Sequence, residues 1–220
     1  MNNDDYAFVS YQTSDKRIAG RIKNILSYCE IPSFLAHEDI EVSREWRDKI
    51  LEEIGRATLF ICLLSKNYKA SAWCMQESGI AAFRKDLTII PFSIDGSIPE
   101  GFIRRFQATQ ISESSLSEKD LLPGLIRHNK KKGIDIIISI LGRSGTYRSA
   151  ESNFKMLLPY LDDLTKEQLE VLLDHILMNK QIHHASLCAK DFIPPILEKH
   201  GDLLAPENLN ILLDVCKEYE

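Results

Sequence analysis

The stretch ATLFICLL, residues 57–64, decides the fold. Its apolar character is almost continuous, which is typical of a strand buried on both faces of a parallel sheet. Similar short runs recur along the first part of the chain, and these are YAFVSY (6–11), PSFLA (32–36), LTIIPFSI (87–94) and ATQIS (108–112). Their starts lie about 20 to 30 residues apart, a spacing that fits repeated strand–helix units. We therefore expect a mostly parallel α/β sheet with helices on both faces.

The segments between these runs have helical periodicity. An amphipathic helix follows the first run, with Asp15 as its expected N-cap. Trp46, Ile50 and Ile54 repeat every four residues, and a further helix is expected over about residues 71–85. Residues 134–141, IDIIISIL, fit either a short buried helix or a strand.

The pattern becomes wholly helical from about residue 149, so we expect a first domain at 1–142 and a small all-α domain at 149–220. Thr165 and Gln168 form a capping-box pattern, and Pro206 suits a first helical turn. Segment 166–176 aligns with segment 206–216 at an offset of 40. This period indicates two HEAT-like helical repeats, and coincidence between two amphipathic helices is the alternative.

Composition excludes several classes of protein. Apolar residues make up 44% and charged residues 27% of the 220 residues, as in ordinary globular proteins. The N-terminus lacks a signal-peptide pattern, and no apolar run approaches the ~20 residues that span a bilayer, so we expect a cytoplasmic protein without a membrane segment. The five cysteines contain no C-x-x-C pair, so neither a disulfide framework nor a metal site is predicted. The net charge of −5 and the acidic C-terminal part argue against a nucleic-acid partner.

Candidate site residues follow from the strand ends. The sequence contains no phosphate-binding P-loop, no dinucleotide-binding glycine motif and no G-x-S-x-G nucleophile elbow. In an open parallel sheet, ligands bind beyond the carboxyl ends of the strands, which here places Ser10, Tyr11 and Ser65 at that edge. Trp73 and Glu77 share one helix face, and an aromatic plane beside a carboxylate suits a nucleoside ligand.

Five motifs occur in order, and they are F-V-S-Y-x-x-S-D-K (8–16), F-L-A-H-E-D-I-x-x-S-x-x-W-R-x-x-I (34–50), L-L-S-x-N-Y (63–68), S-x-W-C-x-x-E (71–77) and I-I-P-F-S-I-D (89–95). Together they resemble a bacterial TIR (Toll/interleukin-1 receptor) domain over about residues 5–141. The resemblance implies a flavodoxin-like five-stranded parallel sheet. The helical tail lies outside it.

The resemblance also implies site residues. Glu77 matches the catalytic glutamate of NAD-cleaving TIR enzymes, and Trp73 belongs to the same W-x-x-x-E motif. Phe34 matches a pocket position, as do Ser10 and Tyr11. The loop after the second strand is implied to contact a neighbouring TIR domain, and its residues are His37, Glu38, Asp39, Ile40 and Trp46. Gln12 and Thr13 depart from the family where some members place a basic residue.

Two functions follow from this resemblance. The first is an NAD+ nucleosidase, in which NAD+ is the substrate and no cofactor is needed. It cleaves the nicotinamide–ribose bond in antiphage defence and gives ADP-ribose or a cyclic ADP-ribose isomer. The carboxylate would stabilise the oxocarbenium character that develops as this bond breaks. The second is a non-catalytic scaffold that forms homo-oligomers through TIR–TIR contacts and binds a protein partner through its helical tail.

Overall fold

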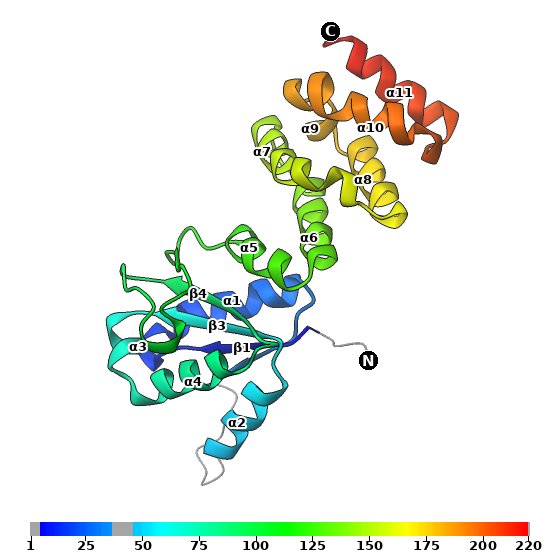
Figure 1. The fold of residues 1–220 in the computed structure, drawn as a ribbon. Coiled ribbons are helices and arrows are strands. Elements are labelled where there is room, and N and C mark those ends of the chain that lie inside the picture. The colour runs from blue at the N-terminus through cyan, green and yellow to red at the C-terminus, as the bar shows by residue number, and fades with distance from the viewer. Residues whose placement is uncertain (1–4, 37–45, 220) are drawn as a thin grey trace. The chain divides into compact units, whose positions relative to one another are not determined.

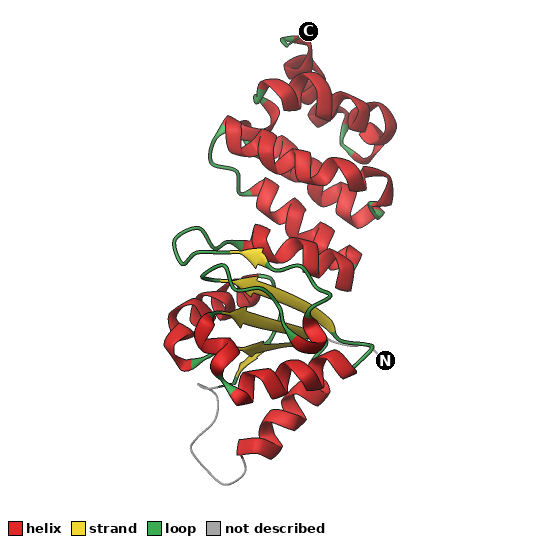
Figure 2. Cartoon of the chain, turned by 60° about the vertical axis from the view of Figure 1, so that its left-hand side comes forward, coloured by secondary structure: helices red, strands yellow, loops and turns green. Residues whose placement is uncertain are grey.

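The computed structural model describes residues 5–36 and 46–219, and the chain divides into two compact units, Met1–His128 and Asn129–Glu220. The first unit combines a sheet with helices and the second is built from helices (Figure 2). The strands are β1 (Ala7–Ser10), β2 (Ser33–Leu35), β3 (Leu59–Leu64), β4 (Thr88–Ser93) and β5 (Thr109–Gln110). The helices of the first unit are α1 (Lys16–Tyr28), α2 (Trp46–Arg56), α3 (Lys66–Ala70), α4 (Ala72–Phe83) and α5 (Glu118–His128).

The five strands form one parallel sheet in the order β2-β1-β3-β4-β5. This is the flavodoxin-like order, so the predicted fold class is confirmed. The chain moves outward from β1 to β2 and then returns past β1 to β3, so the strand order reverses between β1 and β3. Ser10, the last residue of β1, pairs with Cys62 of β3 at this point. Ser10 therefore lies at the point where the strand order reverses.

Helices cover both faces of this sheet, as its apolar strands predict (Figure 1). One face carries α2, α3 and α4, and here Phe8 and Phe60 stack with ring centroids 5.6 Å apart. The opposite face carries α1 and α5, and α5 approaches β4 so closely that a Cβ on Gly124 would lie 2.3 Å from Ile90 Cδ1. Ser10 lies on the same face as Phe8, two residues earlier, and so faces α4.

Two helix ends differ from what their sequences suggest. Asp15 precedes α1, but its carboxylate makes no cap bond and instead accepts a hydrogen bond from Ser65 Oγ at 2.8 Å. The expected Asp15 cap is therefore wrong. At the other end of α1, Glu30 adopts a φ of 54°, and the Ile31 N–H bonds to the Leu26 carbonyl oxygen at 2.8 Å. This is the Schellman ending, in which glycine usually occupies the left-handed position.

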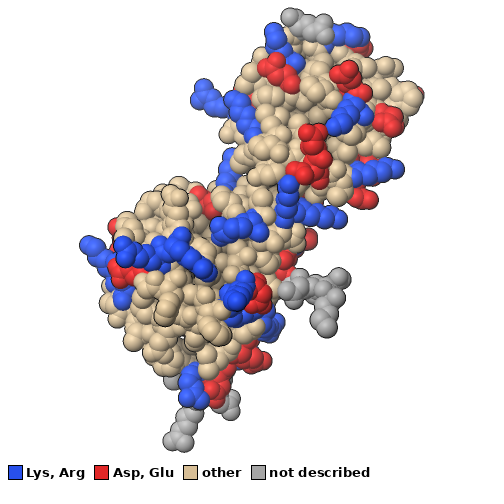
Figure 3. All heavy atoms as spheres, viewed as in Figure 1, with Lys and Arg blue, Asp and Glu red and all other residues tan. Residues whose placement is uncertain are grey.

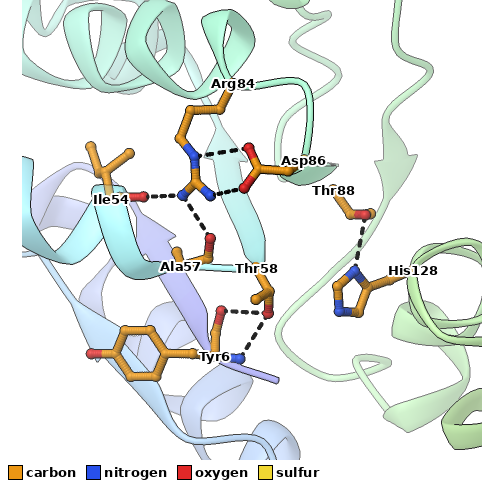
Figure 4. A network of polar contacts seen from close by, with 8 residues as sticks. All are labelled: Tyr6, Ile54, Ala57, Thr58, Arg84, Asp86, Thr88 and His128. Carbon is orange, nitrogen blue, oxygen red and sulfur yellow. Dashed lines mark hydrogen bonds and ion pairs between the residues drawn. The ribbon is translucent and has the colours of Figure 1, made fainter. Parts of the chain in front are cut away.

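A polar network fixes the ends of α2 and α4 against each other. Arg84 follows α4, and its Nη1 donates to the carbonyl oxygens of Ile54 and Ala57 at 2.6 and 2.7 Å (Figure 4). These carbonyls lie at the C-terminus of α2, where no further helical N–H can satisfy them. Asp86 forms an ion pair with the same guanidinium. Arg84 thus sets how α4 is placed over the sheet.

The second unit contains α6 (Lys130–Gly142), α7 (Tyr147–Leu157), α8 (Lys166–Met178), α9 (Lys180–His183), α10 (Ile193–His200) and α11 (Pro206–Lys217). Residues 134–141, which fit either a helix or a strand, lie within α6. We expected the change of pattern near residues 142–149, whereas the chain divides after His128, because α6 packs against α7 and α8.

The two segments related by the offset of 40 lie in α8 and α11. Each helix follows a short 3-10 helix, Leu158–Asp163 before α8 and Gly201–Leu203 before α11. The Thr165–Gln168 capping box is confirmed, with both reciprocal hydrogen bonds present, and Pro206 occupies the first turn of α11. The same order of elements therefore occurs twice in this unit.

Acidic and basic side chains are interspersed on the face of each unit shown in Figure 3. Among the helices that the structure describes, none combines the length and the apolar character needed to cross a membrane.

Candidate active site

Glu77 lies on α4, over the point where the strand order reverses. Ser71 begins this helix, and its Oγ accepts a hydrogen bond from the Cys74 N–H at 3.3 Å. From this start, Glu77 lies in the second turn on the buried face of α4, and only 1% of the residue is exposed. Ser10 Oγ donates to Glu77 Oε2 at 2.5 Å. The end of β1 therefore holds one oxygen of this carboxylate.

The hydroxyls of Tyr68 and Ser78 extend this hydrogen-bonded cluster beyond Ser10. The Tyr68 hydroxyl, from α3, lies 2.9 Å from Ser10 Oγ and 2.8 Å from Ser78 Oγ. It also lies 3.3 Å from the Cys74 carbonyl oxygen. Tyr68 is itself fully buried. Three elements, β1, α3 and α4, thus contribute to one buried polar cluster around Glu77.

The pKa of Glu77 is raised to about 7 from the ordinary 4.5, because burial disfavours the charged form, while the Ser10 hydrogen bond opposes this rise. Burial also raises the pKa of Cys74 to about 11 and the pKa of Tyr68 well above its usual range. Both of these groups are therefore neutral at pH 7. Glu77 is the member of this cluster that changes its charge near physiological pH.

The second oxygen of Glu77, Oε1, is buried and has no hydrogen-bond partner within residues 5–36 and 46–219. A buried carboxylate oxygen without a partner costs free energy, so such atoms are rare in native proteins and concentrate where a ligand or a reaction uses them. A strongly perturbed pKa at a strand-order reversal has the same association. Glu77 is therefore a candidate for chemistry and not only for packing.

Comparison with known proteins identifies the family. A family model described as TIR domain matches residues 7–125. The chain belongs to the TIR domain family. The chain is also similar to the crystal structure of the TIR domain of the Toll-related receptor TRR-2 from Hydra magnipapillata, at 16% identity and a TM-score of 0.45, covering 58% of this chain and 96% of that chain. No curated protein matches the chain.

The structure brings only some of the expected site residues of this TIR domain to the carboxylate. Ser10 contacts Glu77 directly. Ser65 is buried and begins α3, since its Oγ accepts from the Tyr68 N–H at 3.0 Å and donates to Asp15. Phe34 lies in the core and packs against Phe8, with ring centroids 5.5 Å apart. Ser65 thus supports the site through Tyr68, and Phe34 supports the sheet beneath it.

The remaining expected residues lie around this cluster or outside the described chain. Tyr11 is fully buried, immediately after β1. Trp73 is 38% exposed, and its ring packs against that of Trp46 at 4.6 Å between centroids. Trp46 begins α2, so this pair joins α2 to the first turn of α4. The expected assembly-loop residues His37, Glu38, Asp39 and Ile40 lie outside the described residues.

Sequence reasoning missed Tyr68 and Ser78. Tyr68 is carried by a helix of only five residues, which is too short to show a periodic pattern. The tyrosine of the L-L-S-x-N-Y motif was visible as a family feature, but nothing in its spacing shows that its hydroxyl reaches Ser10, which is 58 residues away in the chain. Ser78 follows Glu77 directly and was hidden among ordinary helical residues.

Proposed function

We propose that this TIR domain cleaves the bond between nicotinamide and ribose in NAD+, with Glu77 as its catalytic carboxylate. The observation that carries the proposal is the state of Glu77: one oxygen is held by Ser10, the other is buried without a partner in the described chain, and its pKa is about 7. NAD+ offers the matching chemistry, because its glycosidic carbon becomes cationic as the bond breaks.

In this reaction the electrons of the glycosidic bond leave with nicotinamide, which departs as a neutral molecule. The ribose carbon gains oxocarbenium character, and the negative charge of Glu77 stabilises it in a site of low dielectric. Capture by water, with loss of a proton, gives ADP-ribose. Capture by a nucleophilic atom of the same molecule gives a cyclic ADP-ribose isomer.

The burial of Glu77 sets a condition on this proposal. Because the residue is 1% exposed, the chain around it must rearrange before a ribose can contact Oε1. Assembly of TIR domains is one event that can drive such a rearrangement, so activity should rise with protein concentration. Phe83 and Phe102, 88% and 83% exposed, provide apolar contact area on α4 and on the turn beside it. These two side chains also favour the second candidate function, a scaffold that assembles without turnover.

The test measures nicotinamide release from NAD+ by the full chain over a series of protein concentrations, with chromatographic and mass analysis of the second product. We expect the wild type to release nicotinamide and folded Glu77→Gln to be inactive. The matched control is Glu53→Gln, since Glu53 is also buried in this unit and bonds to Lys49 and Tyr6 away from the site. Undiminished nicotinamide release by folded Glu77→Gln would contradict the proposal that Glu77 is the catalytic carboxylate. A wild type that self-associates but releases nothing would favour the scaffold.

A further inference from the structure

The cluster around Glu77 has a defined direction of hydrogen bonding. Ser10 has one hydroxyl proton, and its bond to Glu77 Oε2 uses it. Ser10 then has no proton left for Tyr68, so in their 2.9 Å contact Tyr68 donates, and the same proton is shared with the longer 3.3 Å bond to the Cys74 carbonyl oxygen. Since the tyrosine proton is then also used, Ser78 must donate in the 2.8 Å contact with Tyr68. The protons thus run from Ser78 through Tyr68 and Ser10 toward the carboxylate.

We propose that Tyr68 is a positioning residue for Glu77, which acts through Ser10 to hold Oε2 and to leave Oε1 as the oxygen that faces the reacting carbon. This inference rests on the proposed function of Glu77. The two carboxylate oxygens of Glu77 have different surroundings. Oε2 accepts the short bond from Ser10, and Oε1 has no partner in the described residues.

The backbone places Tyr68 rigidly enough for this role. Ser65 caps the short helix α3 through the Tyr68 N–H, and Ser65 in turn donates to Asp15. The tyrosine ring belongs to the apolar cluster on the α4 face of the sheet, so its hydroxyl is the polar end of a packed side chain. A group locked by packing and by a second hydrogen bond holds a catalytic partner more accurately than a mobile surface group does.

The hydrogen bonds of this cluster would run in the opposite direction if Glu77 carried a proton on Oε2. Ser10 would then accept from Glu77 and donate to Tyr68, and Tyr68 would donate to Ser78 or to the more distant Cys74 carbonyl oxygen. Donation by Ser10 is therefore the direction that accompanies an ionised carboxylate. Removing the tyrosine hydroxyl should weaken Ser10 as a donor and make ionisation harder.

The other titratable groups that face the cluster do not obscure this effect. Burial raises the pKa of Cys62 on β3, as it does for Cys74 on α4, so both thiols are neutral near pH 7. Asp15 lies before α1 and accepts the hydrogen bond of Ser65. The carboxyl carbon of Glu77 reports this titration directly, because the signal belongs to that residue alone.

The first experiment follows Glu77 directly by NMR in the full chain labelled with ¹³C at the glutamate side-chain carboxyl carbon. Its signal is assigned by its absence from Glu77→Gln. We expect Tyr68→Phe to raise the titration midpoint of this signal by about half a pH unit, since neighbouring hydrogen bonds strengthen one another only partly. Ser10→Ala should raise the midpoint further, and Ser78→Ala less. Tyr28→Phe, which alters an exposed ring, is the control and should leave it unchanged.

The second experiment measures nicotinamide release as a function of pH for the same variants. Tyr68→Phe should lower kcat by roughly tenfold or more with little change in KM, because a misplaced carboxylate costs rate more than binding. The acidic limb of its profile should move to higher pH in step with the NMR midpoint. An unchanged midpoint and an unchanged profile in folded Tyr68→Phe would overturn the positioning role. If the wild type releases no nicotinamide, the proposed function fails, and the NMR midpoints still decide whether Tyr68 controls Glu77.

Discussion

Replacing Glu77 by glutamine should stabilise the first unit, and more so as the pH rises. The pKa of the folded-state carboxyl is about 7 because of burial, above its ordinary value of 4.5. The folded state therefore binds a proton more tightly than the unfolded state between these values. Stability contributed by the neutral form is present at low pH and is lost as the pH rises through 7. Glutamine stays neutral and escapes this loss.

The size of the effect follows from the same two values. A difference between 4.5 and about 7 corresponds to roughly 3 kcal/mol of unfolding free energy, at about 1.4 kcal/mol for each pH unit. The gain of Glu77→Gln over the wild type should reach this value near pH 8 and fall below ~1 kcal/mol near pH 5. Any cost of fitting the amide beside Ser10 is the same at every pH. The pH-dependent part is therefore the quantity to measure.

Tryptophan fluorescence during urea unfolding isolates the relevant unit. The two tryptophans of the sequence, Trp46 and Trp73, both lie in the first unit, with their rings in contact at 4.6 Å between centroids. Their fluorescence therefore follows this unit in the full chain. With a urea slope of about 2 kcal/mol per molar, the midpoint of Glu77→Gln should exceed that of the wild type by ~1.5 M at pH 8.

Glu53 provides a control of opposite sign. Burial acts to raise its pKa, but hydrogen bonds from Lys49 and Tyr6 and the charge of Arg56 outweigh it, so the pKa is lowered. Glu53→Gln should therefore destabilise the unit at neutral pH, with a difference that shrinks as the pH falls through the folded-state pKa. A gain of Glu77→Gln that is the same at pH 5 and pH 8 would contradict this prediction, because it would mean that Glu77 titrates normally in the folded protein.

Three further changes test the scaffold around the site by the same urea assay. Glu30→Gly should stabilise the unit by about 0.5 to 1 kcal/mol, because glycine adopts the positive φ after α1 without steric cost; a loss of stability would contradict this. Arg84→Ala should cost about 2 kcal/mol, since two backbone carbonyls of α2 lose a charged donor, and Arg84→Lys should recover only part of it. Gly124→Ala should cost roughly 1 to 3 kcal/mol through overlap with Ile90, and adding Ile90→Ala should cost less than the two single changes summed.

The fold could be read from the sequence because its signals are local. The run at residues 57–64 is apolar on both faces, and β3 is buried throughout, at the centre of the sheet. The spacing of Trp46, Ile50 and Ile54 similarly predicted α2, which buries the two isoleucines. The boundary near residue 142 rested on where strand signals stop. The packing of α6 with α7 and α8 could not be predicted in this way, because the periodicity of a helix does not show which helices it contacts.

The site was harder to predict, because its contacts are not local. The resemblance pointed to Glu77, and the strand-end argument placed Ser10 near it, as the hydrogen bond shows. Ser65 uses its hydroxyl to begin α3 and to bind Asp15, and both partners depend on the tertiary structure. Tyr68 belongs to a quoted motif but was not predicted as a site residue, because its position does not show where its buried hydroxyl points. Side-chain direction within a packed cluster depends on tertiary structure.

The end of α5 has a consequence for how short this TIR domain can be made. The family match stops at residue 125, yet Arg127 Nη2 donates to the Ile89 carbonyl oxygen at 2.8 Å, and the His128 ring contacts Thr88 Oγ1 at 3.2 Å and Asp5 at 3.0 Å. These bonds tie the last turn of α5 to the start of β4 and to the chain before β1. A chain cut at residue 125 would keep every motif of the site but lose these hydrogen bonds, so we expect a stable form of this TIR domain to extend at least through His128.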